Sequence, residues 1–212
     1  MPYGYLGQNT PNQTVSNSGV FSISDVASLE KQGKFGGSLE LIEEQVITTQ
    51  TSAVDFTNIK GTEYDVHILQ ASNIRNATDD QQFAIRMSVG GTFDTANNYQ
   101  RAIFTIVGSG GSGESRDTAI NNIFFTLNQG NATNEKGNGY AYFYNLHNSS
   151  KYSFVTLQTT TINVNGEYKM NFGGGVYNQT ASVDGIRIFM SNGSNIASGV
   201  FRLYGVKQLW VL

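Results

Sequence analysis

The chain has 212 residues, of which 14% are charged and 12% are aromatic, and it carries a formal net charge of −3 with no cysteine. This composition excludes a disordered chain, which would be poor in aromatic residues, and it excludes disulfides and thiolate metal sites. No basic run is present and no stretch approaches ~18 consecutive apolar residues, so neither nucleic-acid binding nor membrane insertion is expected. The opening residues Met1–Tyr5 lack the basic start and the apolar core of a signal peptide.

Residues 1–38 are expected to form an arm that is separate from the rest of the chain. They begin as a polar segment without a period, and residues 20–23 then alternate like a short strand. A small helix is predicted to follow, with Val26 and Leu29 on one face and Gly33 at its end. The arm residues expected to make docking or oligomer contacts are Phe21, Ile23, Val26 and Leu29.

Residues 39–212 show the two-residue alternation of β-strands, repeated many times. The candidate strands are short, rich in aromatic and β-branched residues, and separated by Gly, Asn and Ser clusters. In one of them Tyr64, Val66 and Ile68 form the apolar side, which leaves His67 on the opposite side. The candidate strands are residues 39–43, 64–69, 83–87, 102–107, 123–127, 140–144, 152–157, 186–190 and 200–204.

Glycine-rich clusters predict the turns between these strands. Asn165-Gly166 indicates a hairpin with a type I′ turn, because both residues tolerate a positive φ. Gly173–Gly175 is expected to be a turn, and Gly108–Gly113 a mobile loop at one end of the domain. Closely spaced strands without intervening amphipathic helices predict an all-β fold, an antiparallel jelly-roll-like β-sandwich.

The sequence offers little for catalysis or for metal binding. Its two histidines are His67 and His147, and no G-x-S-x-G nucleophile motif is present. A surface or inter-subunit hydrogen bond is the expected role of His67, and His147 lies in a predicted turn. There is no H-E-x-x-H motif and no D-x-D-x-D-G loop, so no metal or other cofactor is predicted.

Glycoside hydrolysis by two carboxylates is the enzymatic alternative. Adjacent acidic residues in a strand point to opposite faces and cannot flank one glycosidic bond. The chain is therefore predicted not to be an enzyme. The carboxylates weighed for this chemistry are Asp79, Asp80, Glu114, Asp117, Glu135 and Asp184.

The positive signals concern surfaces. Tyr140, Tyr142 and Tyr144 alternate along one strand, and an exposed row of this kind binds sugars or proteins. In the alternative interpretation the row faces the core and Phe143 points outward, or the strand is buried on both sides. The apolar C-terminal tail, with Trp210 and Leu212, is expected to pack on its own sheet or on a neighbouring subunit.

Several segments resemble virion structural proteins of tailed phages that infect marine cyanobacteria. Residues 19–26, 36–45, 54–59 and 64–67 carry this resemblance, and residues 196–205 resemble the last strand of β-sandwich domains in phage tail fibres. The resemblance covers most of the chain and rests on structural motifs, so it implies a virion component without active-site residues to carry over.

The expected function is therefore a tail-fibre-like virion protein that is made in the host cytoplasm. Its arm would dock to other virion proteins, and its β-sandwich would present a surface to a host glycan or protein. The resemblance to fibres implies a homo-oligomer, with a trimer favoured. The alternatives are a capsid decoration protein that stabilises the head and, less favoured, a polysaccharide depolymerase.

Overall fold

The computed structural model describes residues 23, 24, 27 and 38–207. The chain divides into two compact units, Met1–Ser38 and Leu39–Leu212. Of the residues predicted to make contacts at the two ends, Ile23 is described, and its side chain is exposed. The others lie outside the described residues, as does most of the predicted helix: Phe21, Val26, Leu29, Trp210 and Leu212.

The described part of the second unit, residues 39–207, contains thirteen strands and no helix. This confirms the prediction of an all-β fold. The strands are β1 (Leu39–Ile47), β2 (Ala53–Phe56), β3 (Val66–Asn76), β4 (Phe83–Val89), β5 (Thr92–Phe93), β6 (Tyr99–Val107), β7 (Ser112–Ile120), β8 (Ile123–Phe124), β9 (Gly137–Tyr144), β10 (Ser153–Ile162), β11 (Tyr168–Tyr177), β12 (Gly185–Met190) and β13 (Ile196–Val206).

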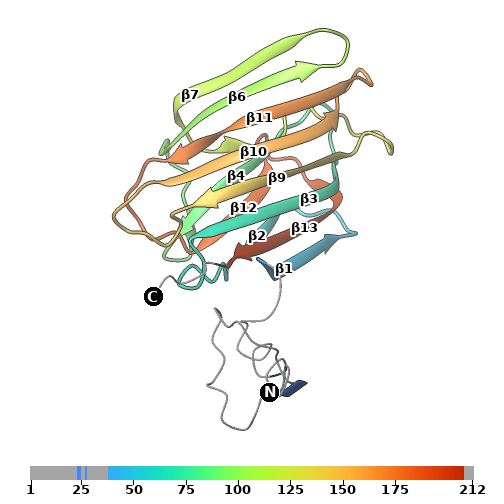
Figure 1. Cartoon of the computed structure of the whole chain (residues 1–212). Coiled ribbons are helices and arrows are strands. Elements are labelled where there is room, and N and C mark those ends of the chain that lie inside the picture. Colours follow the sequence, from blue (N-terminus) through green and yellow to red (C-terminus); the bar gives the residue numbers. More distant parts are fainter. Residues whose placement is uncertain (1–22, 25–26, 28–37, 208–212) are drawn as a thin grey trace, which may run out of the picture. The chain divides into compact units, whose positions relative to one another are not determined.

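The strands form two antiparallel sheets of unequal width. The wide sheet has eight strands in the order β1-β13-β3-β9-β10-β11-β6-β7. The narrow sheet has the order β2-β12-β4-β5, and β8 also pairs with β4. In Figure 1 the wide sheet faces the viewer, and strands β4, β12 and β2 of the narrow sheet lie behind it. The two sheets pack face to face as a β-sandwich.

One continuous core fills the space between the sheets. The wide sheet contributes Leu69, Phe143 and Leu157, and the narrow sheet contributes residues such as Phe56 and Ile188, all of them buried. In β10 and β13 every second residue is buried, because successive side chains of a strand point to opposite faces of the sheet. Burial of large apolar side chains of this kind contributes roughly 1.5–3 kcal/mol each to stability.

The hairpin predicted at Asn165-Gly166 is present between β10 and β11, but its turn type differs from the prediction. Gly166 has φ 75°, whereas Asn165 is not among the residues with positive φ. The main-chain N–H of Gly166 donates to the carbonyl of Asn163, and the Asn163 side chain accepts from the N–H groups of Asn165 and Glu167. This is a three-residue hairpin loop whose last residue, Gly166, has the left-handed conformation. The hydrogen bonds that the Asn163 side chain accepts stabilise the loop.

Two glycine clusters do not have the structure predicted for them. Gly108–Gly113 does not form one loop, because β7 begins at Ser112 and only the preceding residues turn the chain. Gly173–Gly175 is not a turn but lies inside β11, between β10 and β6. Gly173 has φ 144°, and a Cβ on any of the three glycines would meet a carbonyl oxygen of a neighbouring strand. Glycine is required at these positions because the backbones of β10, β11 and β6 lie too close together to leave room for a Cβ.

Replacing Gly174 with alanine should therefore destabilise the sandwich. The new methyl group would meet the carbonyl of Val155, which is backbone and cannot move aside cheaply. We expect the free energy of unfolding in urea to fall by about 1–3 kcal/mol. Gly113→Ala in β7 is the matched control, because a Cβ there meets nothing within 4 Å. Equal stability of the two variants would contradict this account.

His67 occupies the core and not the surface position that was expected. Val66 and Ile68 point outward, half-buried, whereas His67 is fully buried. Its Nε2–H donates to the carbonyl of Ile59 at 2.7 Å, and its ring meets the edge of Tyr64 with centroids 6.0 Å apart. Nδ1 is buried and finds no hydrogen-bond partner among the described residues. Burial lowers the pKa of His67 below its ordinary value, so folding favours the neutral ring.

Acidification should therefore weaken the fold before the carboxylates titrate. The unfolded chain binds a proton at His67 near the ordinary pKa of about 6.5, and the folded chain binds it only at lower pH. The stabilisation is complete above pH ~6.5 and is lost as the pH falls toward the folded pKa. Urea titrations between about pH 7.5 and about pH 5.5 should show this decline. His67→Gln, which retains a donor for Ile59, should flatten it, and an unchanged slope would contradict the assignment.

Candidate functional site

The outer face of the wide sheet is uncharged and rich in aromatic side chains over its five central strands. Val66–Ser72 of β3 and the outward positions of β9, β10, β11 and β6 include no Asp, Glu, Lys or Arg in this described part of the chain. Eight aromatic side chains lie on this side of the sheet, and we call them the aromatic face. They are Phe104, Tyr140, Tyr142, Tyr144, Phe154, Tyr168, Phe172 and Tyr204.

The tyrosine row of β9 lies on this face. Tyr140 is 41% exposed, whereas Phe143, which lies between Tyr142 and Tyr144 in the sequence, is fully buried in the core. Strand β9 is therefore aromatic on both of its sides, which is why the sequence alone left its orientation open. The interpretation with Tyr140, Tyr142 and Tyr144 facing outward is the one that the structure has, and the alternative with Phe143 outward is wrong.

Cross-strand hydrogen bonds hold these tyrosine rings in place. The hydroxyl of Tyr140 donates to Oε1 of Gln158 at 2.9 Å, and that of Tyr204 donates to Oε1 of Gln70 at 3.4 Å. Tyr144 shares a bond of 3.3 Å with the hydroxyl of Thr156. Within the row, neighbouring ring centroids are 5.8 and 6.3 Å apart, the first pair edge to face and the second stacked. The rings are thus positioned before any ligand arrives.

Phenylalanines extend the face across the sheet. Phe104 of β6 and Phe172 of β11 are opposite each other, with ring centroids 5.6 Å apart. Phe154 of β10 is opposite Tyr144 and is 46% exposed. Exposed aromatic residues scattered singly need no explanation, but a contiguous group on a rigid sheet is typical of a binding surface.

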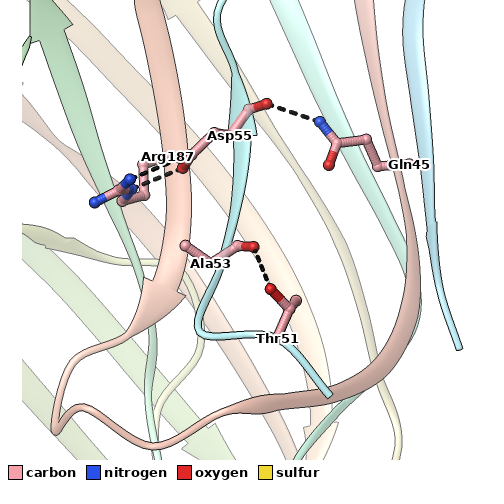
Figure 2. Close-up of polar contacts among 5 residues, drawn as sticks. All are labelled: Gln45, Thr51, Ala53, Asp55 and Arg187. Atoms are coloured by element: carbon pink, nitrogen blue, oxygen red, sulfur yellow. Dashed lines mark hydrogen bonds and ion pairs between the residues drawn. The ribbon is translucent and has the colours of Figure 1, made fainter. Parts of the chain in front are cut away.

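The outer face of the narrow sheet has a different chemistry. Figure 2 shows the guanidinium of Arg187 in β12 directed at the carboxylate of Asp55 in β2, with N–O distances of 2.6 and 2.7 Å. This bidentate contact raises the pKa of Arg187. The main-chain carbonyl of Asp55 accepts from Nε2 of Gln45 at 2.7 Å, so the same residue links edge strand β1 of the wide sheet to the narrow sheet.

The carboxylates weighed for glycoside hydrolysis are engaged in local structure. Asp79 and Glu135 accept from consecutive main-chain N–H groups, those of Asn131 and Ala132. The remaining candidates have local partners too. Asp80 accepts from Asn128, Asp117 from Ala119, Asp184 from Gly91 and Ser88, and Glu114 pairs with Arg116.

A shallow pocket of about 200 Å³ lies beside β6 and β7. Glu114 is the one carboxylate on its lining, where Lys169 is the basic residue. A pair of carboxylates facing a shared cavity, which glycoside hydrolysis requires, is not formed by these lining residues. His147 is exposed in its turn, with its Nδ1 2.9 Å from the hydroxyl of Ser182.

The described residues hold neither a metal-binding cluster nor a membrane-spanning helix. There, no group of three or more His, Asp or Glu side chains is arranged to hold a metal ion. No helix in the same residues is long and apolar enough to cross a membrane.

Comparison with known proteins adds no identification. No protein-family model, no curated protein and no solved structure matched the chain.

Proposed function

We propose that this chain is a tail-fibre-like structural protein of a phage particle, whose β-sandwich recognises the host surface through the aromatic face. The observation that carries the proposal is the outward tyrosine row of β9, held by cross-strand hydrogen bonds within an uncharged sheet face. The resemblance of several segments to cyanophage virion proteins supplies the biological setting.

A glycan is the partner that the chemistry of this face fits best. Aromatic rings offer flat apolar surfaces for the C–H faces of sugar rings, and they lose little conformational entropy on binding. The amide of Gln158 and the hydroxyl of Thr156 lie among the rings and can exchange hydrogen bonds with sugar hydroxyls. The absence of charged side chains at the outward positions of these central strands favours a neutral sugar. Each contact is weak, and repetition over many copies on one particle raises the total affinity.

The same proposal includes a jelly-roll connection of the strands in the β-sandwich. Strand pairs such as β1–β13, β2–β12 and β3–β13 join segments that are far apart in the sequence, as the strands of a jelly roll do. Residues 1–38 serve as the docking arm toward other virion proteins. The assembled form is a homo-oligomer, with a trimer favoured by the resemblance to fibres.

A capsid decoration protein is the second candidate. The uncharged aromatic face favours it as well, because a wide apolar surface can also lie against a protein shell. In either case the chain acts by binding, and no enzymatic step is proposed.

The aromatic face is tested by removing one ring. Tyr142→Ala should weaken binding to glycans extracted from host envelopes by about tenfold, equivalent to about 1.4 kcal/mol. Binding is measured by surface plasmon resonance with the immobilised glycan. Val164→Ala is the control, since Val164 is 42% exposed but lies in the turn between β10 and β11. Equal affinity of both variants would remove the face from host recognition.

The position on the particle is tested by immunogold labelling of intact phage. Label at the tail is expected, and label spread over the head would establish the decoration protein instead. Deletion of residues 1–35 should leave a folded protein that no longer enters particles, as measured by circular dichroism and by blotting of purified phage. Normal incorporation of the truncated chain would contradict the docking role of the arm.

A further inference from the structure

Two arginines lie side by side on the outer face of the narrow sheet. Arg86 of β4 and Arg187 of β12 are directly opposite each other in the strand register. Each guanidinium lies on a phenylalanine ring. Cζ of Arg86 is 4.2 Å from the ring centroid of Phe189, and Cζ of Arg187 is 4.1 Å from that of Phe93. A guanidinium that lies over a ring keeps N–H groups available at its edge, and an N–H edge suits a planar anion.

The two arginines differ in how their charge is balanced. Arg187 has its bidentate contact with Asp55. Arg86 donates from Nε to the carbonyl of Asn121 at 2.9 Å, and no described carboxylate lies within ion-pair distance of it. Its terminal nitrogens make no hydrogen bond to the described residues. Four N–H groups of a half-buried cation are therefore free to bind an anion.

Nearby carboxylates are already committed elsewhere. Asp94 is close enough to act on the charge of Arg86, but it accepts from the N–H of Ala96, from Nδ2 of Asn98 and from the hydroxyl of Tyr177. Partial burial lowers the pKa of Arg86, and the positive charge of Arg187 acts in the same direction. A half-buried cation beside a second cation is stabilised by an external anion.

We propose that Arg86, together with Arg187, binds the carboxylate of an acidic sugar in a polysaccharide. The carboxylate would accept from the free N–H edge of Arg86, while the sugar ring lies against Phe189 or Phe93. A uronate combines a planar anion with an apolar ring face, and these are the two features that the arginines and the phenylalanines present. An acidic peptide offers the anion on a flexible side chain and leaves the two rings unused.

The test is calorimetric titration of the full-length protein with an oligogalacturonate at low salt. Arg86→Gln should weaken binding at least tenfold, and Arg86→Lys, which keeps the charge but loses the planar fork, should weaken it by a smaller factor. Arg116→Gln is the matched control, because Arg116 is an exposed arginine of the same chain with a side chain that is 80% accessible. Rising salt should weaken binding of the wild-type protein.

Comparison ligands separate this site from others. A neutral oligosaccharide should not compete, and Tyr142→Ala should bind the oligogalacturonate like wild type, so the site stands or falls independently of the aromatic face. The proposal is overturned if the oligogalacturonate does not bind, if Arg86→Gln binds it normally, or if poly-glutamate binds as tightly as the uronate. Thermal melting of Arg86→Gln establishes that it is folded, and Arg86→Lys serves as the test variant if it is not.

Discussion

The burial of one layer of side chains between two sheets of unequal width is the constraint on which the rest of the structure depends. The inner faces of both sheets are committed to this layer, with residues such as Phe143 and Ile188 fully enclosed. The wide sheet has eight strands and the narrow sheet has fewer. The narrow sheet therefore does not cover every strand of the wide sheet equally. Most residues of β7 are exposed on both sides of the strand, and the shallow pocket lies beside it.

The same constraint leaves both outer faces free to differ. Side chains that point away from the core contribute little to the packing between the sheets. The residue types on the two outer faces can therefore differ without disturbing the core. The outer face of the wide sheet carries hydrogen-bonded tyrosines and no charged side chain at the described outward positions of its central strands, whereas that of the narrow sheet carries arginines stacked on phenylalanines. A single sandwich thus presents one outer face without charge and one outer face that carries arginines.

The class of fold could be predicted from the sequence, because strand alternation and turn residues are local signals. The orientation of individual strands could not. In β3 and β9 both sides are apolar or aromatic, so alternation alone did not show that His67 and Phe143 point inward. The glycines of β11 were wrongly predicted to form a turn. Glycine is needed there because the backbones of β10 and β6, which are distant in sequence, leave no room for a Cβ.

The surfaces divide in the same way. The tyrosine row of β9 could be proposed from three residues of one strand. The arginine pair could not, because Arg86 and Arg187 lie 101 positions apart and meet only through the register of β4 and β12. The stacking of each guanidinium on a phenylalanine leaves no pattern in the sequence. Neither does the contact of Asp55 with Arg187 alone.

The pairing of β1 with β13 has a mechanical consequence. Leu39 is opposite Val206, so the polypeptide enters and leaves the sandwich at neighbouring points on one edge. A force that separates these two points would open the β1–β13 ladder one residue pair at a time, which requires little force at each step. A force on Leu39 along the direction of β1 would load all the paired residues of that ladder at once. Tension between Leu39 and a point at the far end of the sheet therefore meets more resistance than tension between Leu39 and Val206.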